Sequence, residues 1–457
     1  MKKIEYEELL NTLSSTGADF SEVFEEDNVQ TTYKFIDSKL DNINIETIRG
    51  IGFRIEKDGD IYYNSTNKLD VDNLKSEAKK LSLNLKGSSN KKITLNELEE
   101  VYPKVEVEHK DLPVEKKKKI FIDLDKKIRA YSDLIDQVVL GFVEEDRDIT
   151  IANSEGKFIK SRRTITRFIC QVFTTKGDIK EKSFTDQAVG QGYEFLDKYN
   201  LEELALNCAK IAVEKLDAED FKGGELPVIL CPGFGAVIFH EACGHGLEAT
   251  SVGPKVSVFS EDLGKVVASP KVTLVDDGTL EGCWGSNCID DEGYPTKRNV
   301  LIENGVLKKY LVDKMNSKKM NQEYNGCGRR QSYGYPPTSR MSNTYLLPGE
   351  DKIEDMIKSI DLGVFCEKMS GGSVNPGTGE FNFAVDSAFL IENGKLTKRI
   401  KGITLIGTSK EILKNVEMVS NDLLISGGYC GSKSGTIPVT IGEPTIKVSK
   451  ILVGGKE

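Results

Sequence analysis

The stretch LPVILCPGFGAVIFHEACGH, residues 226–245, determines the architecture of the second half of this chain. Its first six residues form a mostly apolar run with the length and composition of a buried strand. Pro232 follows at a position that suits the first turn of a helix. Small and apolar residues then lead to His240. We therefore expect a buried helix to carry His240, Glu241 and His245.

The two histidines of this stretch are informative because the chain has only three histidines in 457 residues. Neutral imidazole is a preferred ligand of zinc, and the carboxylate of Glu241 suits a general base. The spacing is one residue longer than H-E-x-x-H, which places both rings on one helical face. On a regular α-helix a five-residue step leaves the rings about 140° apart. We therefore expect a π-bulge or an unwound turn before His245, eased by Gly244.

If the two histidines bind a metal rather than merely pack in the core, a third ligand is needed. A catalytic zinc site usually has three protein ligands and one open position. Cys430 is the foremost choice, because the glycines around it let its loop approach another element closely. His109, Cys283, Cys288 and any of the numerous carboxylates remain open alternatives.

Composition argues against several classes of protein. The net charge is −10, and the lysine run at residues 116–119 suits a solvated helix face, so we expect no nucleic-acid partner. No apolar run reaches about 18 residues, so we expect no membrane-spanning helix. The N-terminus turns acidic at once, unlike a secretory signal. Nine scattered cysteines without a Cys-x-x-Cys pair fit a reducing compartment, so we expect a cytoplasmic protein.

The first half of the chain shows two cycles of helix followed by strands. The predicted helices are residues 4–14, 71–85, 114–134 and 201–216. The predicted strands are residues 31–45, 50–63, 137–143, 148–152, 157–174 and 180–189. Residues 86–112 are polar and irregular and are predicted to form a linker. These patterns predict an α+β domain with antiparallel meanders over residues 1–222, with a possible break near residues 86–113.

The second half is rich in glycine and in strand patterns. The predicted strands are residues 271–275, 299–303, 306–311, 343–347, 381–392 and 398–406, with short helices near residues 353–360 and 410–415. We expect a curved or barrel-like sheet packed around the buried motif helix. The predicted fold class is thus α+β, with a β-rich catalytic domain over residues 223–457.

Several segments in a fixed order resemble the TldD/PmbA family of peptidases, which combine an H-E-x-x-x-H motif with a distant cysteine. The segments follow His240–His245 and are Val275–Gly278, Ile289–Gly293, Asn299–Gly305, Gly328–Tyr333, Met341–Tyr345, Lys401–Gly407, Met418–Leu423 and Cys430–Gly431. They span most of residues 226–455. The first half resembles the family more loosely, in the order of its elements and in Arg49–Arg54.

The family has a TldD-like branch that holds the metal motif and a PmbA-like (TldE) branch that lacks it and acts as a partner. This chain keeps His240, Glu241, His245 and Cys430 and so resembles the catalytic branch. The resemblance implies a cytoplasmic zinc peptidase that takes short or unfolded peptides. It also implies a homodimer or a heterodimer with a TldE-like subunit. On this hypothesis His240, His245 and Cys430 bind zinc, and Glu241 is the general base.

An oxyanion-stabilising group is also expected, and the two motif histidines are already assigned to the metal. Arg330, Tyr333 and Tyr335 in a glycine-rich segment are the predicted groups, with the bracing of a loop as their alternative role. The glycine-rich residues 370–379 either accept an extended peptide or form a plain surface loop.

Two other functions stay open at this stage. The chain could be a non-catalytic peptide-binding or assembly subunit of a TldD/TldE-like complex. It could also be a cysteine hydrolase that uses Cys430 as the nucleophile, which requires one of the histidines as a base.

Overall fold

Strands make up much of this chain, and helices accompany them in both halves. The computed structural model describes residues 1–233, 235 and 237–455. In it 44% of the chain is strand and 22% is helix, with a curled sheet and a closed barrel. The predicted α+β fold class is therefore confirmed.

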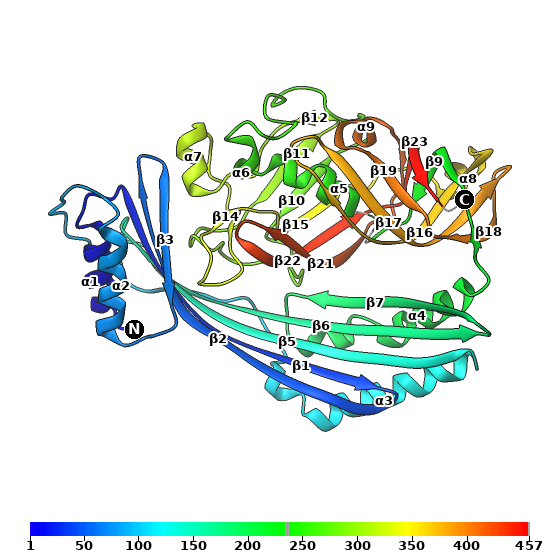
Figure 1. Ribbon diagram of the computed structural model, residues 1–457, viewed down its shortest axis with the longest axis horizontal. Helices are drawn as coiled ribbons and strands as arrows, with labels where there is room; N and C mark the ends of the chain where they lie inside the picture. The colour runs from blue at the N-terminus through cyan, green and yellow to red at the C-terminus, as the bar shows by residue number, and fades with distance from the viewer. Residues whose placement is uncertain (234, 236, 456–457) are drawn as a thin grey trace.

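A seven-stranded sheet forms the first half of the molecule and runs along the C-terminal half (Figure 1). Its order is β3-β2-β1-β5-β6-β4, with β7 paired to β6, and only the β4–β6 pair is parallel. The strands are β1 (Phe20–Ile36), β2 (Lys39–Lys57), β3 (Asp60–Thr66), β4 (Glu99–Val101), β5 (Ile135–Asn153), β6 (Phe158–Lys176) and β7 (Ile179–Val189). Strands from both sides of residues 86–113 therefore belong to one sheet.

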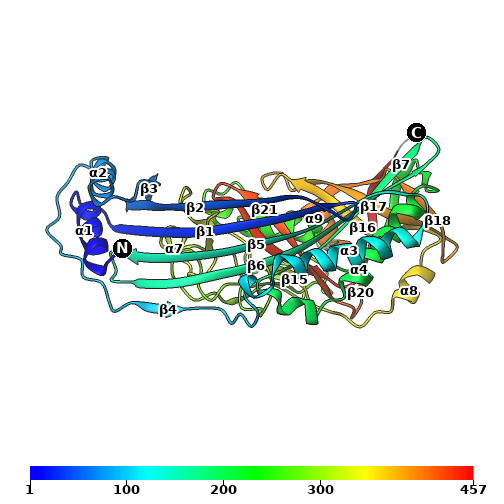
Figure 2. The same ribbon diagram turned by 90° about the horizontal axis from the view of Figure 1, so that it is seen from below.

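Helices cover this sheet in two groups (Figure 2). The first group, at one end, is α1 (Lys3–Ser14) and α2 (Val71–Ser82); the second, across one face, is α3 (Val114–Tyr131) and α4 (Leu201–Lys215). Two 3-10 turns, η1 (His109–Asp111) and η2 (Tyr193–Asp197), connect these elements. Aromatic rings in tilted and edge-on contact fill the core between α3 and the sheet: the ring centroid of Phe142 lies 4.7 Å from that of Phe121 and 5.9 Å from that of Phe168. None of the described helices is both long and apolar enough to cross a membrane.

The predicted helices of the first half are confirmed to within a few residues, but one predicted strand is wrong. Residues 31–45 do not form a single strand, because β1 turns back into β2 at Asp37 and Ser38. Both turn residues have positive φ, 51° and 63°. Neither is glycine or asparagine, so the sequence lacks the usual signal for such a turn.

Five strands of the second half close into a barrel, which confirms the predicted barrel-like sheet. Their order is β16-β9-β23-β19-β17, and the pairing of β16 with β17 closes the ring. They are β9 (Gly223–Leu230), β16 (Leu362–Val374), β17 (Glu380–Glu392), β19 (Thr404–Thr408) and β23 (Ile446–Gly454). Beside them lie β8 (Glu219–Asp220), β18 (Lys395–Lys401), β20 (Val416–Val419), α8 (Ile353–Lys358) and α9 (Ser409–Lys414).

A second sheet of six strands, in the order β12-β11-β10-β15-β22-β21, completes the C-terminal half. Its strands are β10 (Leu274–Asp277), β11 (Arg298–Glu303), β12 (Val306–Leu307), β15 (Asn343–Leu346), β21 (Leu424–Ser432) and β22 (Gly435–Glu443). Shorter elements of this half are η4 (Gly244–Leu247), α6 (Ala249–Val252), α7 (Lys314–Met320), β13 (Gly328–Arg329) and β14 (Thr338–Ser339). The motif helix α5 (Val237–Ala242) contacts β16 and β17 of the barrel and β15 and β22 of this sheet. Apolar residues on α5 are buried in the C-terminal core, as the sequence predicts.

Buried ion pairs join the two halves of the molecule. Oε2 of Glu22 on β1 lies 2.8 Å from Nη2 of Arg54, and its Oε1 lies 2.6 Å from Nη2 of Arg330. Nη1 of Arg54 also lies 2.7 Å from Oε1 of Glu292. These side chains are at most 1% exposed. Because Arg330 and Glu292 belong to the C-terminal half, Glu22 links that half to the long sheet.

We expect Glu22→Gln to lower the free energy of unfolding by roughly 3–5 kcal/mol, because it removes the carboxylate that two buried guanidinium groups share. Urea-induced unfolding would measure this loss. Asp123→Asn is the matched control, because Asp123 pairs with Lys119 on the exposed face of α3 and such pairs contribute little. Equal stability of the two variants would contradict a linking role for Glu22.

Candidate metal centre

The backbone changes its helical form between the two motif histidines. The α-helix α5 ends at Ala242, and residues Gly244–Leu247 form a separate 3-10 turn, η4. The helix is therefore distorted between the histidines as predicted, but by a break at Cys243 followed by a tighter 3-10 turn and not by a π-bulge. It brings the ring centroids of His240 and His245 to 5.3 Å, with the rings nearly perpendicular. A Cβ atom at Gly244 would lie 1.9 Å from Sδ of Met341, so this turn packs too tightly for a side chain.

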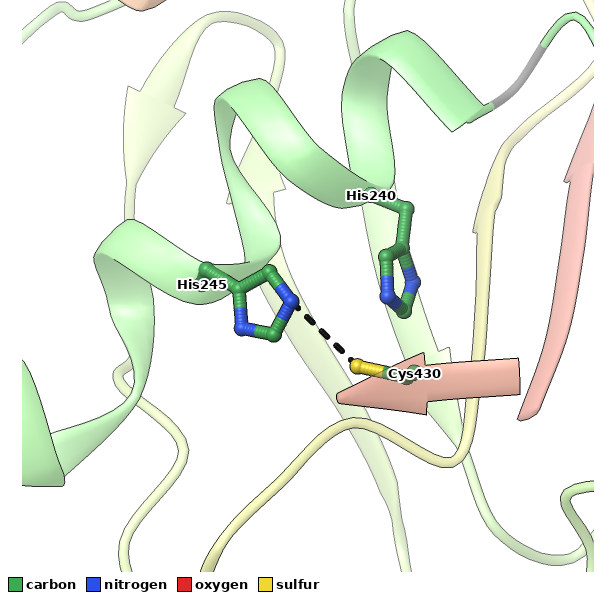
Figure 3. Close-up of side chains that lie close together, drawn as sticks. All are labelled: His240, His245 and Cys430. Atoms are coloured by element: carbon green, nitrogen blue, oxygen red, sulfur yellow. Dashed lines mark hydrogen bonds between the residues drawn. The ribbon is translucent and has the colours of Figure 1, made fainter. Parts of the chain in front are cut away.

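Cys430 lies beside these two rings although it is 185 residues from His245. Its Sγ is 3.2 Å from Nε2 of His245. One ligand atom from each of His240, His245 and Cys430 lies within 4.8 Å of the others, and all three residues are buried (Figure 3). Cys430 is part of strand β21, so the prediction that it lies in a loop is wrong. Its pairing with β22 fixes the backbone that presents the sulfur.

The donor atoms of this cluster fit a zinc ion. Imidazole nitrogen and thiolate sulfur are both preferred zinc ligands, and three protein ligands leave a fourth position open, as in catalytic zinc sites. Nδ1 of His240 is buried and has no hydrogen-bond partner within the described part of the chain. A buried polar atom without a partner is unfavourable unless a ligand engages it. The unpartnered nitrogen therefore makes metal binding a better explanation of this cluster than packing in the core.

The electrostatics of the cluster favour the thiolate that a metal requires. Burial alone would raise the pKa of Cys430, but His240 and His245 outweigh it and hold this pKa well below its ordinary value. Burial alone would lower the pKa of His245, yet Glu248 and Cys430 raise it well above its ordinary value. The thiolate is the form of cysteine that ligates metals.

Glu241 combines proximity to the cluster with partial access to solvent. Its Oε2 lies 3.7 Å from Nε2 of His245, and its side chain is 19% exposed, more than either histidine. Burial raises the pKa of Glu241, and the nearby Cys430 and Glu248 raise it further against the lowering by the histidines. A carboxylate with a raised pKa is suited to accept and return a proton near neutral pH.

The structure also brings two residues to the cluster that the sequence did not suggest. Oε1 of Glu248 lies 3.3 Å from Nδ1 of His245 and 3.7 Å from Nε of Arg340. Nη2 of Arg340 donates a hydrogen bond of 2.5 Å to the carbonyl oxygen of Cys430. Contacts of this kind orient metal ligands. The position of Glu248, three residues after His245, is a usable sequence signal, whereas nothing in the sequence marks Arg340.

Two of the three residues predicted to stabilise an oxyanion, Arg330 and Tyr333, make contacts away from the cluster. Arg330 is buried and donates to Glu22 and to the carbonyl oxygen of Asp291. The backbone N–H of Tyr333 donates to Glu26, and its ring packs against Gly50 on β2. Tyr335 is 36% exposed. These contacts favour the bracing role for Arg330 and Tyr333, and the oxyanion role stays a prediction.

The alternative ligands named from the sequence lie in other surroundings. Both ring nitrogens of His109 are hydrogen-bonded at 2.9 Å, one to Asp146 and the other to Thr166. Cys283 and Cys288 flank Trp284 and Ser286 in the loop before β11. Within the described residues the His–His–Cys cluster is the group whose ligand atoms converge.

Family models cover most of the chain. The C-terminal domain of the PmbA/TldA metallopeptidases matches residues 223–455, the central domain residues 108–217 and domain 1 residues 21–84. The chain belongs to the PmbA/TldD family of metallopeptidases. Residues 240–245 and Cys430 both fall within the matched C-terminal domain.

Relatives across this family carry matching names. The metalloprotease TldD homolog of Buchnera aphidicola (from Acyrthosiphon pisum) is 31% identical and covers 98% of this chain and 95% of its own. A metalloprotease of Methanocaldococcus jannaschii is 33% identical over 90% of this chain and 92% of its own. The zinc metalloprotease TldD homolog of Saccharolobus solfataricus is 29% identical over 66% of this chain and 68% of the relative's own length. These names support a metallopeptidase role, and the last names the metal for that relative.

Solved structures agree with the fold. TldE from Thermococcus kodakarensis is 20% identical, with a TM-score of 0.75 over 96% of this chain and 97% of its own. A protein from Thermotoga maritima is also 20% identical, and it has a TM-score of 0.77 over 99% of this chain and 100% of its own. At this identity the likeness establishes the fold alone.

We expect Gly427→Ala to destabilise the strand that carries Cys430. A Cβ atom at Gly427 would lie 2.5 Å from Cβ of Ala188 and 2.7 Å from Cε3 of Trp284. Overpacking of this kind costs about 1–3 kcal/mol, which thermal or urea unfolding would detect. Gly431→Ala is the control, because its nearest neighbour is 4.0 Å away. A Gly427 variant as stable as the Gly431 variant would contradict the close approach.

Proposed function

We propose that this protein is a zinc-dependent peptidase of the TldD-like branch that hydrolyses short or unfolded peptides. The observation that carries the proposal is the convergence of His240, His245 and Cys430 at one buried point, with Glu241 beside them. Family membership and the names of the relatives support the same reaction class.

The chain's own residues have separate roles in this proposal. His240, His245 and the Cys430 thiolate hold the ion, while Glu248 and Arg340 orient two of these ligands. A zinc ion held by these residues would supply a Lewis acid for water and for the peptide carbonyl. Glu241 accepts a proton from the attacking water and returns it to the leaving amine.

The substrate in this proposal is an extended peptide bound by main-chain hydrogen bonds. Residues 370–374, predicted as part of a peptide-binding segment or a loop, continue β16 and pair with β17 on one side. The pairing of β16 with β9 covers only Val364–Cys366 among the described residues. The other edge of this glycine-containing half of β16 thus has backbone groups available to a peptide strand.

We further propose a cytoplasmic protein that works as a homodimer or with a TldE/PmbA-like subunit, and the division into domains 1–222 and 223–457. The fold shared with TldE supports a family-type association. Size-exclusion chromatography with light scattering, with and without a TldE-like subunit, would test this association.

Glu241→Gln is expected to keep stoichiometric zinc and to lower peptide turnover by about 10²–10⁴-fold, the usual contribution of a general base. Mass spectrometry of a digested peptide mixture would measure turnover, and metal analysis would measure zinc. Unchanged turnover in this variant would rule out the proposed mechanism.

Cys430→Ser is expected to lower the zinc content of the purified protein well below one ion per chain, because serine is a poorer zinc ligand than a thiolate. Cys288→Ser is the matched control and should retain the metal. Full zinc retention in the Cys430 variant would remove this residue from the ligand set.

A cysteine hydrolase is the second function, favoured by the 3.2 Å contact between Cys430 and His245 and by the lowered thiol pKa. Chelation distinguishes it from the metallopeptidase, because a cysteine enzyme would keep its activity without metal and lose it on alkylation of Cys430. A non-catalytic peptide-binding or assembly subunit is the remaining alternative, and it would carry no stoichiometric zinc and cleave no peptide.

A further inference from the structure

A cavity of about 230 Å³ lies between the long sheet and the hairpin formed by β21 and β22, and its lining is rich in arginine. These side chains come from β5 and β6 on one wall and from β13 and the residue after it on the other. The charged residues of the lining are Arg147, Arg162, Arg163, Arg329 and Arg330, against a single carboxylate, Glu145. The balance of charge in the lining favours an anion.

Two of these guanidinium groups have donors to spare. A guanidinium carries five N–H donors. Nε of Arg147 lies 2.8 Å from Oε1 of Glu26, and Nη2 of Arg163 lies 2.7 Å from Oδ1 of Asp291. Nη2 of Arg147 and Nε of Arg163 are buried and have no hydrogen-bond partner among the described residues. Buried donors without acceptors are unfavourable, so a ligand with acceptor oxygens would stabilise this region.

Arg329 lacks a carboxylate partner. Its Nη1 and Nη2 donate to the carbonyl oxygens of Met341 at 2.6 Å and Pro438 at 2.7 Å. Within the described residues no carboxylate lies at ion-pair distance from it. Burial, together with the repulsion of Arg163, lowers the pKa of Arg329 to about 10. An anion near Arg329 would offset a positive charge that the protein leaves unpaired.

The β21–β22 hairpin lies between the cavity and the candidate metal cluster and contributes residues to both. Tyr429, Ile437 and Pro438 of this hairpin line it, and Ile437 is the residue paired with Cys430 across the two strands. Cross-strand partners have Cα atoms about 4.5–5.5 Å apart. An extended peptide advances about 3.3–3.6 Å per residue. Successive side chains of a strand point to opposite faces, so Tyr429, which lies against Trp284, and Cys430, which lies against His245, face opposite sides of β21. A peptide whose scissile bond lies at the cluster therefore has to pass the end of the hairpin to reach the arginines.

We propose that this cavity binds the C-terminal carboxylate of the peptide substrate. Guanidinium groups match a carboxylate in geometry as well as in charge, and the neighbouring Trp284 and Tyr429 offer apolar contact for a terminal side chain. The inference rests on the proposed peptidase function and adds a preference to it. Peptides with a free C-terminus a few residues from the scissile bond are favoured over amidated or internal segments.

Binding rather than turnover tests this proposal. Calorimetry on zinc-loaded Glu241→Gln protein would compare an N-acetylated hexapeptide as the free acid, as the C-terminal amide, and as an amide ending in glutamate. The free acid should bind at least tenfold more tightly than either amide. Equal affinity of the free acid and the plain amide would overturn the proposal. An amide ending in glutamate that binds as tightly as the free acid would overturn the assignment to the chain terminus.

Arg329→Met is the variant of choice, because it removes a charge without leaving a buried carboxylate unpaired. It should lower the affinity for the free acid at least tenfold and leave the affinity for the amide within twofold. Arg298→Met, which removes a half-exposed charge from β11, is the matched control and should change neither affinity. Equal losses for acid and amide in the Arg329 variant would indicate a merely structural role and overturn the proposal.

Failure of this inference differs from failure of the proposed function. If the wild-type protein cleaves no peptide but prefers the free acid, the cavity assignment stands and the peptidase does not. If it cleaves free acids and amides alike and binds both equally, the peptidase stands and the cavity assignment falls. The comparison of acid with amide needs no cavity variant, so equal affinities would overturn the proposal even if Arg329→Met does not fold.

Discussion

The convergence of two imidazoles and one sulfur on a single buried point is the constraint on which this site depends. The two rings come from one short segment, and the sulfur comes from a strand near the end of the chain. Three elements must therefore be held in fixed relation: the end of α5, the turn η4 and the strand β21. The α5 helix sits against strands of both C-terminal sheets, and Arg340 ties the carbonyl of Cys430 to the carboxylate beside His245. Packing and hydrogen bonding thus hold the three side chains in the arrangement that a metal site would require.

The break in the helix between the histidines explains how H-E-x-x-x-H brings its two rings together although it is one residue longer than H-E-x-x-H. An α-helix repeats every 3.6 residues, so ligands four residues apart share a face and ligands five apart do not. The α-helix ends at Ala242, and the break at Cys243 before the 3-10 turn leaves the ring centroid of His245 5.3 Å from that of His240. Glu248 follows in the same segment and lies against His245, so one local distortion brings together two imidazoles and a carboxylate.

The buried charges between the two halves serve a different purpose from those of the metal cluster. Glu22, Arg54 and Glu292 satisfy one another and fix the C-terminal half against the long sheet. The arginines that line the nearby cavity are less completely paired, and Arg329 has only carbonyl acceptors. Paired charges hold a structure together, whereas unpaired buried donors indicate a place for a ligand.

The sequence by itself determined the α+β class, most helices of the first half, the barrel-like second half, and the choice of His240, His245 and Cys430, which the structure brings together. These features depend on local periodicity, on the rarity of histidine and on motif order, all of which a single chain displays. Only the tertiary structure decided that Cys430 lies on a strand, that Arg330 braces the two halves, and that Glu248 and Arg340 support the ligands. The turn at Asp37 and Ser38 and the closure of the barrel by β16 also appeared only there. The reason is physical: strand pairing and the contacts of a buried charge join residues hundreds of positions apart, and no local pattern records them.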